Sequence, residues 1–403
     1  MKAVVSLNSG SSSIKFALFT IDAQGAPRFS AGGKIEGIGV APHLVGRATG
    51  GEVLVERSWK DGASLGHDAL LADLFEWSAG HLGDNEVIAI GHRVVHGGTE
   101  FASPRLVDDA LLEKLEALCP LAPLHQPHNL AAIRAIAKLQ PRLPQVACFD
   151  TAFHHDMPEI AARLAIPRAL HDRGIRRYGF HGLSYEYIAR SLAELDPPLA
   201  GGRVIAAHLG NGASLCAIRG GKSVDTTMGF TALDGLMMGT RCGSIDPGVA
   251  LHLETQIGMS PAQVEDLFYN KSGLLGVSGV SSDMRALHGS SDPRAAEAVE
   301  LFAWRAAREA GALIASLEGL DGLVFTAGIG ENDPVVRASI CERLAWAGIV
   351  LDPESNARNT PVISAGNSRI AVRVIPTDEE RMIAIHMLNV LNSGSLLDGK
   401  ARS

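Results

Sequence analysis

Residues 4–16 have the sequence VVSLNSGSSSIKF, and this stretch says more about the fold than any other part of the chain. An apolar run leads into one glycine, four serines, an asparagine and a lysine, and Ile14, Phe16 and Leu18 then alternate with other residues. The pattern predicts a strand, a tight turn and a second strand. The hydroxyl and amide groups of such a turn are small hydrogen-bond donors, and together with the positive charge of the lysine they can bind a polyphosphate. In a Walker loop a helix follows the glycines, so we expect a nucleotide kinase or ATPase of another type.

A second segment of the same kind lies at residues 204–218, VIAAHLGNGASLCAI. A serine-rich turn alone is also typical of a plain surface turn. Its repetition in the second half of the chain favours ligand binding. The spacing is far longer than that of a solenoid repeat. We therefore predict two similar domains that face each other and hold phosphates between the two hairpins.

Composition sets the broad class. The chain has 403 residues, 46% of them hydrophobic and 20% charged, which suggests two or three globular domains. Its apolar runs are shorter than the roughly 18 residues of a membrane span, and the N-terminus lacks a signal-peptide pattern. The five scattered cysteines fit reduced thiols. We expect a cytoplasmic protein that does not act on membranes, and the net charge of −8 argues against nucleic acid as a partner.

Strands and helices alternate along the chain, which predicts an α/β layered fold. The expected strands are 4–8, 14–20, 53–57, 87–91, 145–149 and 323–326, and the expected helices are 64–80, 108–118, 128–138, 246–258, 260–269, 292–318 and one that begins near 378–380. We predict an N-terminal domain over 1–150 that the helix near 380–392 completes. A C-terminal nucleotide-binding domain covers 151–379, and 393–403 form a polar tail.

Two arginines are candidate ligand contacts. Arg93 is expected just past a strand end, beside His92 and His96, where α/β sheets bind ligands, and its planar fork matches a carboxylate or a phosphate. The spacing of the two histidines lacks the glutamate of a zinc motif, so we do not expect zinc there. Arg241 lies among glycines in a loop, where a ligand role is favoured over a surface salt bridge.

Other candidates are weaker on their own. Asp150 ends a strand, where an acid can orient an arginine or a water on magnesium. His181 lies on a loop with glycines and is more often structural by itself. Residues 328–330 match only part of a dinucleotide fingerprint, so they indicate either a glycine-rich loop near adenosine or a plain strand–helix turn. Residues 378–380 are acidic and fit a helix start or a magnesium ligand.

Taken together, these segments resemble the acetate kinase family (acetate, propionate and butyrate kinases) within the actin-like phosphotransferase superfamily. The match spans nearly the whole chain, and its motifs are NSGSSSIKF at 8–16, GHRVVHGG at 91–98, FDTAFH at 149–154, RYGFHG at 177–182, HLGNG at 208–212, Thr226 with Met228, Gly229 and Phe230, SSD at 281–283 and FTAGIGEN at 325–332. The resemblance implies the duplicated actin-like (ribonuclease H-like) ATPase fold, with two domains around a central cleft.

The resemblance also implies roles for single residues. The implied catalytic residues are Asp150, His181 and Arg241, and the implied substrate contacts are Arg93 for the carboxylate with Val95, Leu124 and Phe180 around the methyl group. The implied metal positions are Asn8 and Glu379. The implied ATP contacts are Ser11, Ser13, Lys15, His208, Leu209, Gly210, Asn211, Gly212, Asp283, Met284, Arg285, Gly328, Ile329, Gly330, Glu331 and Asn332.

The expected activity is Mg²⁺-dependent, reversible in-line transfer from ATP to acetate, which gives acetyl phosphate and ADP; Mn²⁺ can replace Mg²⁺. Acetate is ionised at neutral pH and needs no general base, so Asp150 is expected to orient Arg241 or magnesium waters. Ala232 replaces a proline of the family's methyl pocket, and Met284 replaces a common aromatic residue. Propionate or butyrate kinase activity therefore stays open, as does, more distantly, a non-kinase actin-like or chaperone-like ATPase. The family is typically homodimeric.

Overall fold

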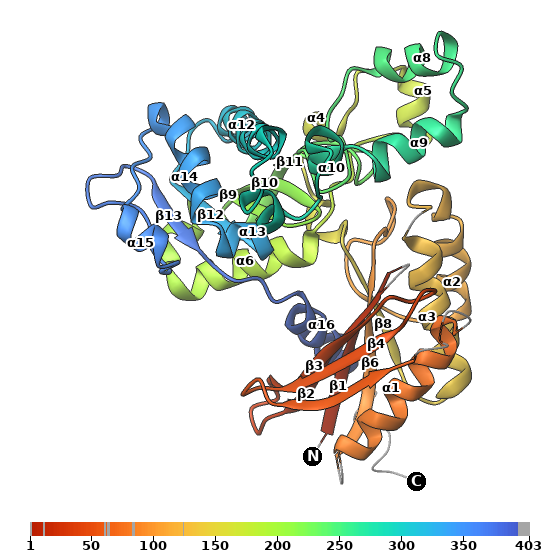
Figure 1. Cartoon of the computed structure of the whole chain (residues 1–403). Helices are drawn as coiled ribbons and strands as arrows, with labels where there is room; N and C mark the ends of the chain where they lie inside the picture. The colour runs from red at the N-terminus through yellow and green to blue at the C-terminus, as the bar shows by residue number, and fades with distance from the viewer. Residues whose placement is uncertain are drawn as a thin grey trace. The chain divides into compact units, whose positions relative to one another are not determined.

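The computed structural model describes residues 2–10, 13–59, 62, 65–82, 85–123 and 125–393. It divides into two compact units, which are described separately: unit 1 is Met1–Ala152 with Asp378–Ser403, and unit 2 is Phe153–Thr377. Figure 1 shows the chain coloured from red at the N-terminus to blue at the C-terminus. The predicted contacts Ser11 and Leu124, and the tail beyond Ser393, lie outside the described residues.

Unit 1 is built on an eight-stranded sheet with the order β5-β4-β3-β2-β1-β6-β8-β7. β1 pairs antiparallel with β2 and parallel with β6, so the predicted opening hairpin is confirmed. β3 and β4 escape prediction because their glycines weaken a strand pattern. Packing explains Gly33, since a Cβ there would lie 2.1 Å from the carbonyl oxygen of Val45. The strands are β1 Lys2–Ser9, β2 Ser13–Ile21, β3 Pro27–Glu36, β4 His43–Ala48, β5 Val53–Ser58, β6 Glu86–Val94, β7 Arg105–Leu106 and β8 Gln145–Phe149.

Four helices cover this sheet: α1 His67–Leu82, α2 Asp109–Glu116, α3 Gln126–Leu139 and α16 Glu379–Ser393. Side chains of α1 and α3, among them Leu71 and Ile136, join Leu7 and Ile35 of the sheet in one buried core. α16, coloured blue in Figure 1, packs beside β1 and β6. Gly91 of β6 makes room for it, because a Cβ at that position would lie 2.4 Å from Ile383. The last helix of the chain thus belongs to the N-terminal fold.

Unit 2 has a five-stranded sheet with the order β11-β10-β9-β12-β13. Its strands are β9 Arg203–Leu209, β10 Ala213–Arg219, β11 Lys222–Thr226, β12 Gly322–Thr326 and β13 Ala371–Val374. β9 pairs antiparallel with β10 and parallel with β12. The same directions hold along β3-β2-β1-β6-β8 of unit 1. The predicted repeat of the hairpin is therefore confirmed, and it extends over five strands.

Two long helices pack on this sheet. α6 (Gly182–Leu195) contributes Tyr185, Ile188 and Leu192 to a core with β9 and β10, and α12 (Pro293–Leu317) also lies against β10 (Figure 1). Several helices begin with an aspartate or serine cap followed by proline, which suits a helix N-terminus. The other helices of unit 2 are α4 Glu159–Ala162, α5 Arg168–His171, α7 Pro197–Ala200, α8 Pro247–Thr255, α9 Pro261–Asn270, α10 Gly273–Ser278, α11 Met284–His288, α13 Ala327–Asn332, α14 Pro334–Arg343 and α15 Pro353–Ala357.

Within the described ranges, no helix combines the length and the apolar character that crossing a bilayer requires.

Three buried histidines make the fold sensitive to acid. Burial lowers the pKa of His92, His96 and His154 from 6.5 to about 4. The unfolded chain therefore binds more protons between these two pH values, and the free energy of unfolding falls as the pH drops through this window. Each such histidine contributes about 1.4 kcal/mol per pH unit. We expect urea unfolding to need less denaturant at pH 5 than at pH 7.

The matched variants are His154→Gln and His155→Gln, since His155 is the more exposed neighbour. The first variant should lose part of the pH dependence and the second should keep it. Equal unfolding free energies for the unaltered protein at pH 5 and pH 7 would contradict this account.

Candidate active site

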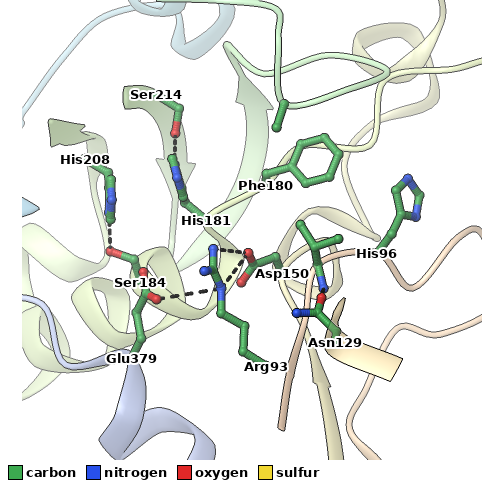
Figure 2. A network of polar contacts seen from close by, with 12 residues as sticks. Arg93, His96, Asn129, Asp150, Phe180, His181, Ser184, His208, Ser214 and Glu379 are labelled. Carbon is green, nitrogen blue, oxygen red and sulfur yellow. Dashed lines mark hydrogen bonds and ion pairs between the residues drawn. The ribbon is translucent and has the colours of Figure 1, made fainter. Parts of the chain in front are cut away.

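Arg93 and Asp150 form an ion pair at the end of two parallel strands of unit 1. Arg93 is the next-to-last residue of β6, so it lies within the strand and not past its end as predicted, and Asp150 directly follows β8. Nε and Nη2 of Arg93 donate to Oδ2 of Asp150 at 2.9 and 2.5 Å (Figure 2). The Asp150 side chain is 1% exposed and that of Arg93 is 23% exposed. A buried carboxylate thus orients a guanidinium that solvent still reaches.

Glu379, the first residue of α16, also faces this arginine. Its Oε2 lies 3.9 Å from Nε of Arg93. Burial raises the pKa of Glu379, while the charges of Arg93 and Lys15 oppose that shift. Burial by itself would lower the pKa of Arg93, but Asp150 and Glu379 raise it above its ordinary value. Arg93 therefore stays positively charged, and the carboxylates of Asp150 and Glu379 restrict the position of its guanidinium.

The opening hairpin places further predicted residues in unit 1. Asn8 and Lys15 are paired across β1 and β2, and Lys15 is exposed. Ser13 accepts a hydrogen bond from the backbone N–H of Gly10 through its carbonyl, at 2.8 Å, which closes the turn. Asn8 and Glu379 offer an amide oxygen and a carboxylate, which are hard ligands that suit Mg²⁺ when phosphate oxygens complete the set. The donor types therefore fit the metal that the resemblance implies.

Two amide side chains at the start of α3 support this end of the sheet, and they were not predicted. Asn129 accepts from the N–H of Val95 at 3.0 Å and donates to the carbonyl of Ser9 at 2.7 Å. Gln126 accepts from the N–H of His96 at 3.1 Å. Asn129 thus ties the phosphate hairpin to the loop after Arg93. Two amides at helical spacing i, i+3 are the signal that could have revealed this support.

Unit 2 holds a stacked pair of histidines. His181 precedes α6 with a left-handed backbone (φ 58°), and its ring stacks on that of His208 with centroids 4.1 Å apart. Nδ1 of His181 pairs with Oγ of Ser214 at 2.8 Å, and Nδ1 of His208 pairs with Oγ of Ser184 at 2.9 Å (Figure 2). Both rings are therefore oriented through Nδ1.

Arg241 and His181 converge on Gly212. Nη1 of Arg241 donates to the carbonyl of Ala232 at 2.7 Å. A Cβ on Gly212 would lie 3.1 Å from Nη2 of Arg241 and 3.3 Å from Nε2 of His181. The structure therefore brings together two residues predicted to act on the phosphoryl group, and only a glycine leaves space between them.

A cavity of about 780 Å³ lies within unit 2. Its lining includes half of the predicted ATP contacts: Gly210, Asn211, Asp283, Met284, Arg285, Gly328, Ile329 and Asn332. It also includes residues that sequence reasoning missed: Ser282, His288, Asp333, Pro334 and Val335. The Asp283–Arg285 ion pair at its edge lowers the pKa of Asp283 to about 2. The volume lies in the range of small-molecule sites.

The glycine-rich run after β12 is a helix and not the expected loop. Ala327–Asn332 form α13, and Ala327 takes a left-handed backbone (φ 65°) at its first position. Glu331 turns inward, where its Oε1 accepts from the N–H groups of Ala327 and Thr377 at 2.7 and 3.1 Å. Glu331, Gly330, Gly212, Leu209 and His208 are not part of the cavity lining. The backbone is a strand followed by a helix, which contacts of Glu331 hold in place, and the ligand role of Gly328, Ile329 and Asn332 stays a prediction.

Arg337 is a fully buried arginine that was not predicted. It donates to the carbonyl of Gly330 at 2.9 Å and to Asn356 and Asn359, so it joins α13 to the α15 region. These acceptors are neutral, and burial lowers its pKa. An arginine that shares a helix face with Ile340 and Cys341 was the available signal.

Asp150 contacts Arg93 in unit 1. Its expected role toward Arg241 or magnesium waters stays a prediction. Of the residues predicted around the methyl group, Val95 is buried in unit 1 and Phe180 is buried in unit 2.

His154 is a buried residue of unit 2. Its Nδ1 pairs with Ser223, and its Nε2 pairs with the carbonyl of Phe180.

The repeated five-strand topology of the two units is that of the duplicated actin-like fold, and the charged and hydrogen-bonding residues at the strand ends suit a phosphotransferase. The acetokinase family model matches residues 3–385, so the chain belongs to the acetokinase family. It is 49% identical over 391 residues to the acetate kinase of Nitrobacter hamburgensis, which covers 97% of this chain and 96% of the relative. It is 50% identical over 392 residues to an acetate kinase of Rhodopseudomonas palustris, with 96% and 98% covered.

Solved structures agree. The acetate kinase of Porphyromonas gingivalis has a TM-score of 0.85 at 38% identity and covers 97% of this chain and 100% of its own. A propionate kinase from Francisella tularensis has a TM-score of 0.88 at 38% identity, with 96% and 99% covered.

Gly212→Ala tests the convergence of Arg241 and His181. The added Cβ should push one of them aside by a few tenths of an ångström, so we expect kcat to fall about 10- to 100-fold while KM for ATP changes little. Steady-state kinetics measure both. Gly366→Ala is the control, since a Cβ there meets nothing within 4 Å. An unchanged kcat in Gly212→Ala would show that this space is not used.

Arg337→Met tests the support of α13. The Gly330 carbonyl would lose its donor, and a buried group left unpaired costs about 1–3 kcal/mol. We expect KM for ATP to rise about tenfold while KM for acetate stays constant. Arg343→Met, at the end of the same helix, should leave both KM values unchanged. An equal rise in both KM values would point to general unfolding instead.

Proposed function

We propose that the residues described above carry out the reaction of this family, and that the chain is an acetate kinase. It transfers the γ-phosphoryl group of ATP to acetate, reversibly, to give acetyl phosphate and ADP. The observation that carries the assignment of the site is Arg93, a cation that a buried carboxylate holds in place while part of the guanidinium stays accessible. A guanidinium with one edge occupied has its other edge available for a substrate carboxylate.

The main obstacle in this reaction is charge. Acetate is already an anion at neutral pH, so no residue has to remove a proton. The attacking carboxylate must instead approach a negatively charged phosphoryl group. We propose that Arg93 binds the acetate carboxylate and that Asp150 positions Arg93, so that Asp150 is not a proton acceptor. The arrangement supports direct in-line transfer, in which positioning and charge stabilisation supply the rate.

His181 and Arg241 are proposed to act on the transferring group. Both present a nitrogen toward Gly212, where neither is blocked by a side chain. Donors fixed before the reaction stabilise the charge on the equatorial oxygens without reorganisation. Ser214 orients His181 through Nδ1, and the Ala232 carbonyl orients Arg241.

The nucleotide is proposed to bind in the 780 Å³ cavity of unit 2. α13 supplies one wall, and Met284 supplies a flexible thioether that can pack on a purine ring. Asn8 and Glu379 would hold Mg²⁺, or Mn²⁺ in its place. The metal would neutralise phosphate charge when bound.

Ala232 supports a second candidate, a kinase for propionate or butyrate. The smaller side chain replaces the family's usual proline and gives more room where the acyl chain is expected. We propose acetate as the best substrate, because the relatives at 49% and 50% identity are acetate kinases. A homodimer and a cytoplasmic location remain predictions, and size-exclusion chromatography with light scattering tests the former.

A coupled assay of ADP release with acetate, propionate and butyrate tests the function. We expect the highest kcat/KM with acetate and little ATP hydrolysis without a carboxylate. Arg93→Gln should lower kcat/KM for acetate at least about 100-fold, and KM for ATP should change little. Arg105→Gln, an exposed arginine on β7, is the control. An optimum at a longer chain would favour the second candidate, and hydrolysis without carboxylate dependence would reject the kinase.

A further inference from the structure

A chain of hydrogen bonds runs from the last residue of unit 2 to His208. Thr377 precedes the point where the chain passes to unit 1, and its hydroxyl donates to Oγ of Ser184 at 2.9 Å. Ser184, on α6, is fully buried, and its Oγ lies 2.9 Å from Nδ1 of His208 (Figure 2). These residues are distant in sequence, so only the fold brings them together.

The direction of these hydrogen bonds sets where the proton of His208 lies. A serine hydroxyl has one proton to donate and two lone pairs that accept. With Thr377 as a donor to Ser184, the proton of Ser184 is available to be donated to Nδ1 of His208, which lies within hydrogen-bond distance. An Nδ1 that accepts a hydrogen bond leaves the proton of the neutral ring on Nε2.

The Nε2 atom of His208 lies near a predicted ATP contact, Gly210. It lies 4.0 Å from the position of a Cβ on Gly210, a residue that lines the cavity. A phosphate oxygen near Gly210 accepts hydrogen bonds. The Nε2–H tautomer donates to it, whereas the other tautomer would present a lone pair to an anion.

We propose that Thr377 and Ser184 are positioning residues that fix His208 as the Nε2–H tautomer, so that His208 donates to the bound nucleotide. This proposal rests on the proposed ATP site of unit 2 and assigns that site two residues outside its lining.

Glu331 links the same relay to the cavity wall. One carboxylate oxygen accepts from the N–H of Thr377 and from that of Ala327, the first residue of α13. The position of Thr377 and the start of α13 are therefore set by one atom. Glu331 contributes by holding both, although it is not part of the cavity lining. Glu379 follows Thr377 by two residues, so the relay also holds the chain just before the proposed metal ligand.

The tautomer can be measured directly. The full-length protein, with its histidines labelled by ¹⁵N, is examined by long-range ¹H–¹⁵N NMR with and without ADP, and the His208→Gln spectrum identifies the signals of His208. We expect the pattern of a neutral ring protonated at Nε2 at pH 8. A proton on Nδ1, or a ring that carries both protons, would overturn the proposal without any variant of the relay.

The relay is then tested by Thr377→Val, which removes the hydroxyl and keeps the β-branched shape. We expect the His208 signals to shift toward the other tautomer and KM for ATP to rise about tenfold, equal to about 1.4 kcal/mol, with kcat nearly unchanged. Thr377→Ser should restore both. Thr255→Val, on α8, is the control because it also removes a hydrogen-bonded threonine hydroxyl, which donates to the carbonyl of Leu251 and accepts from Gln256, outside the cavity lining.

Thermal melting and ADP titration calorimetry separate the remaining outcomes. A lower melting temperature in Thr377→Val with unchanged ATP affinity and an unchanged spectrum would overturn the proposal and leave Thr377 a structural role. The proposed function can fail while this proposal holds. In that case the Nε2–H tautomer would depend on Thr377 and the protein would bind ADP, but turnover would not depend on a carboxylate.

Discussion

The pairing of Arg93 with the buried carboxylate of Asp150 is the constraint on which the rest of unit 1 depends. A buried charge is costly unless a partner of opposite charge and hydrogen bonds compensate it. Parallel pairing of β6 with β8 places the two side chains at the same sheet edge, where the pair can form. Asn129 then holds the loop after Arg93 and the hairpin turn in one frame. Loss of that strand pairing would separate the two charges and expose the fold to the cost of a buried carboxylate without Arg93.

The two units hold their candidate site residues with different kinds of interaction. Unit 1 supplies formal charges: Arg93 lies between two carboxylates, and Lys15 is close enough for its charge to oppose the shift of Glu379. Unit 2 orients its two stacked histidines with serine hydroxyls, which pair with Nδ1 of His181 and of His208. Neutral donors fixed in a buried setting avoid the desolvation cost of additional charges. In the proposed function, unit 1 would thus bind the acceptor by charge, and unit 2 would bind the nucleotide by directed donors and shape.

Much of this could be predicted. Hydrophobic alternation on either side of polar turns located both hairpins, and helical periodicity located α1, α2, α3, α8, α9, α12 and α16. It missed α6 and α14. Half of the expected ATP contacts line one cavity because their motifs follow strands and caps in a fixed order. β3 and β4 were missed since their glycines serve packing between strands, which local sequence does not display. α13 was expected as a loop because the contact of Glu331 with Thr377 is not local.

The sequence by itself determined the family, the repeat of the phosphate hairpin, and the residue types that meet two anions, because these depend on local pattern and on chemistry carried within short motifs. Only the tertiary structure decided which groups meet. In the folded chain Asp150 pairs with Arg93, and Arg337 donates to the carbonyl of Gly330 in α13. Glu331 accepts from the N–H of Thr377, and the hydroxyl of Thr377 contacts Ser184, which in turn contacts His208. The physical reason is that hydrogen bonds and ion pairs act over about 3–4 Å in space, whereas the partners lie far apart along the chain.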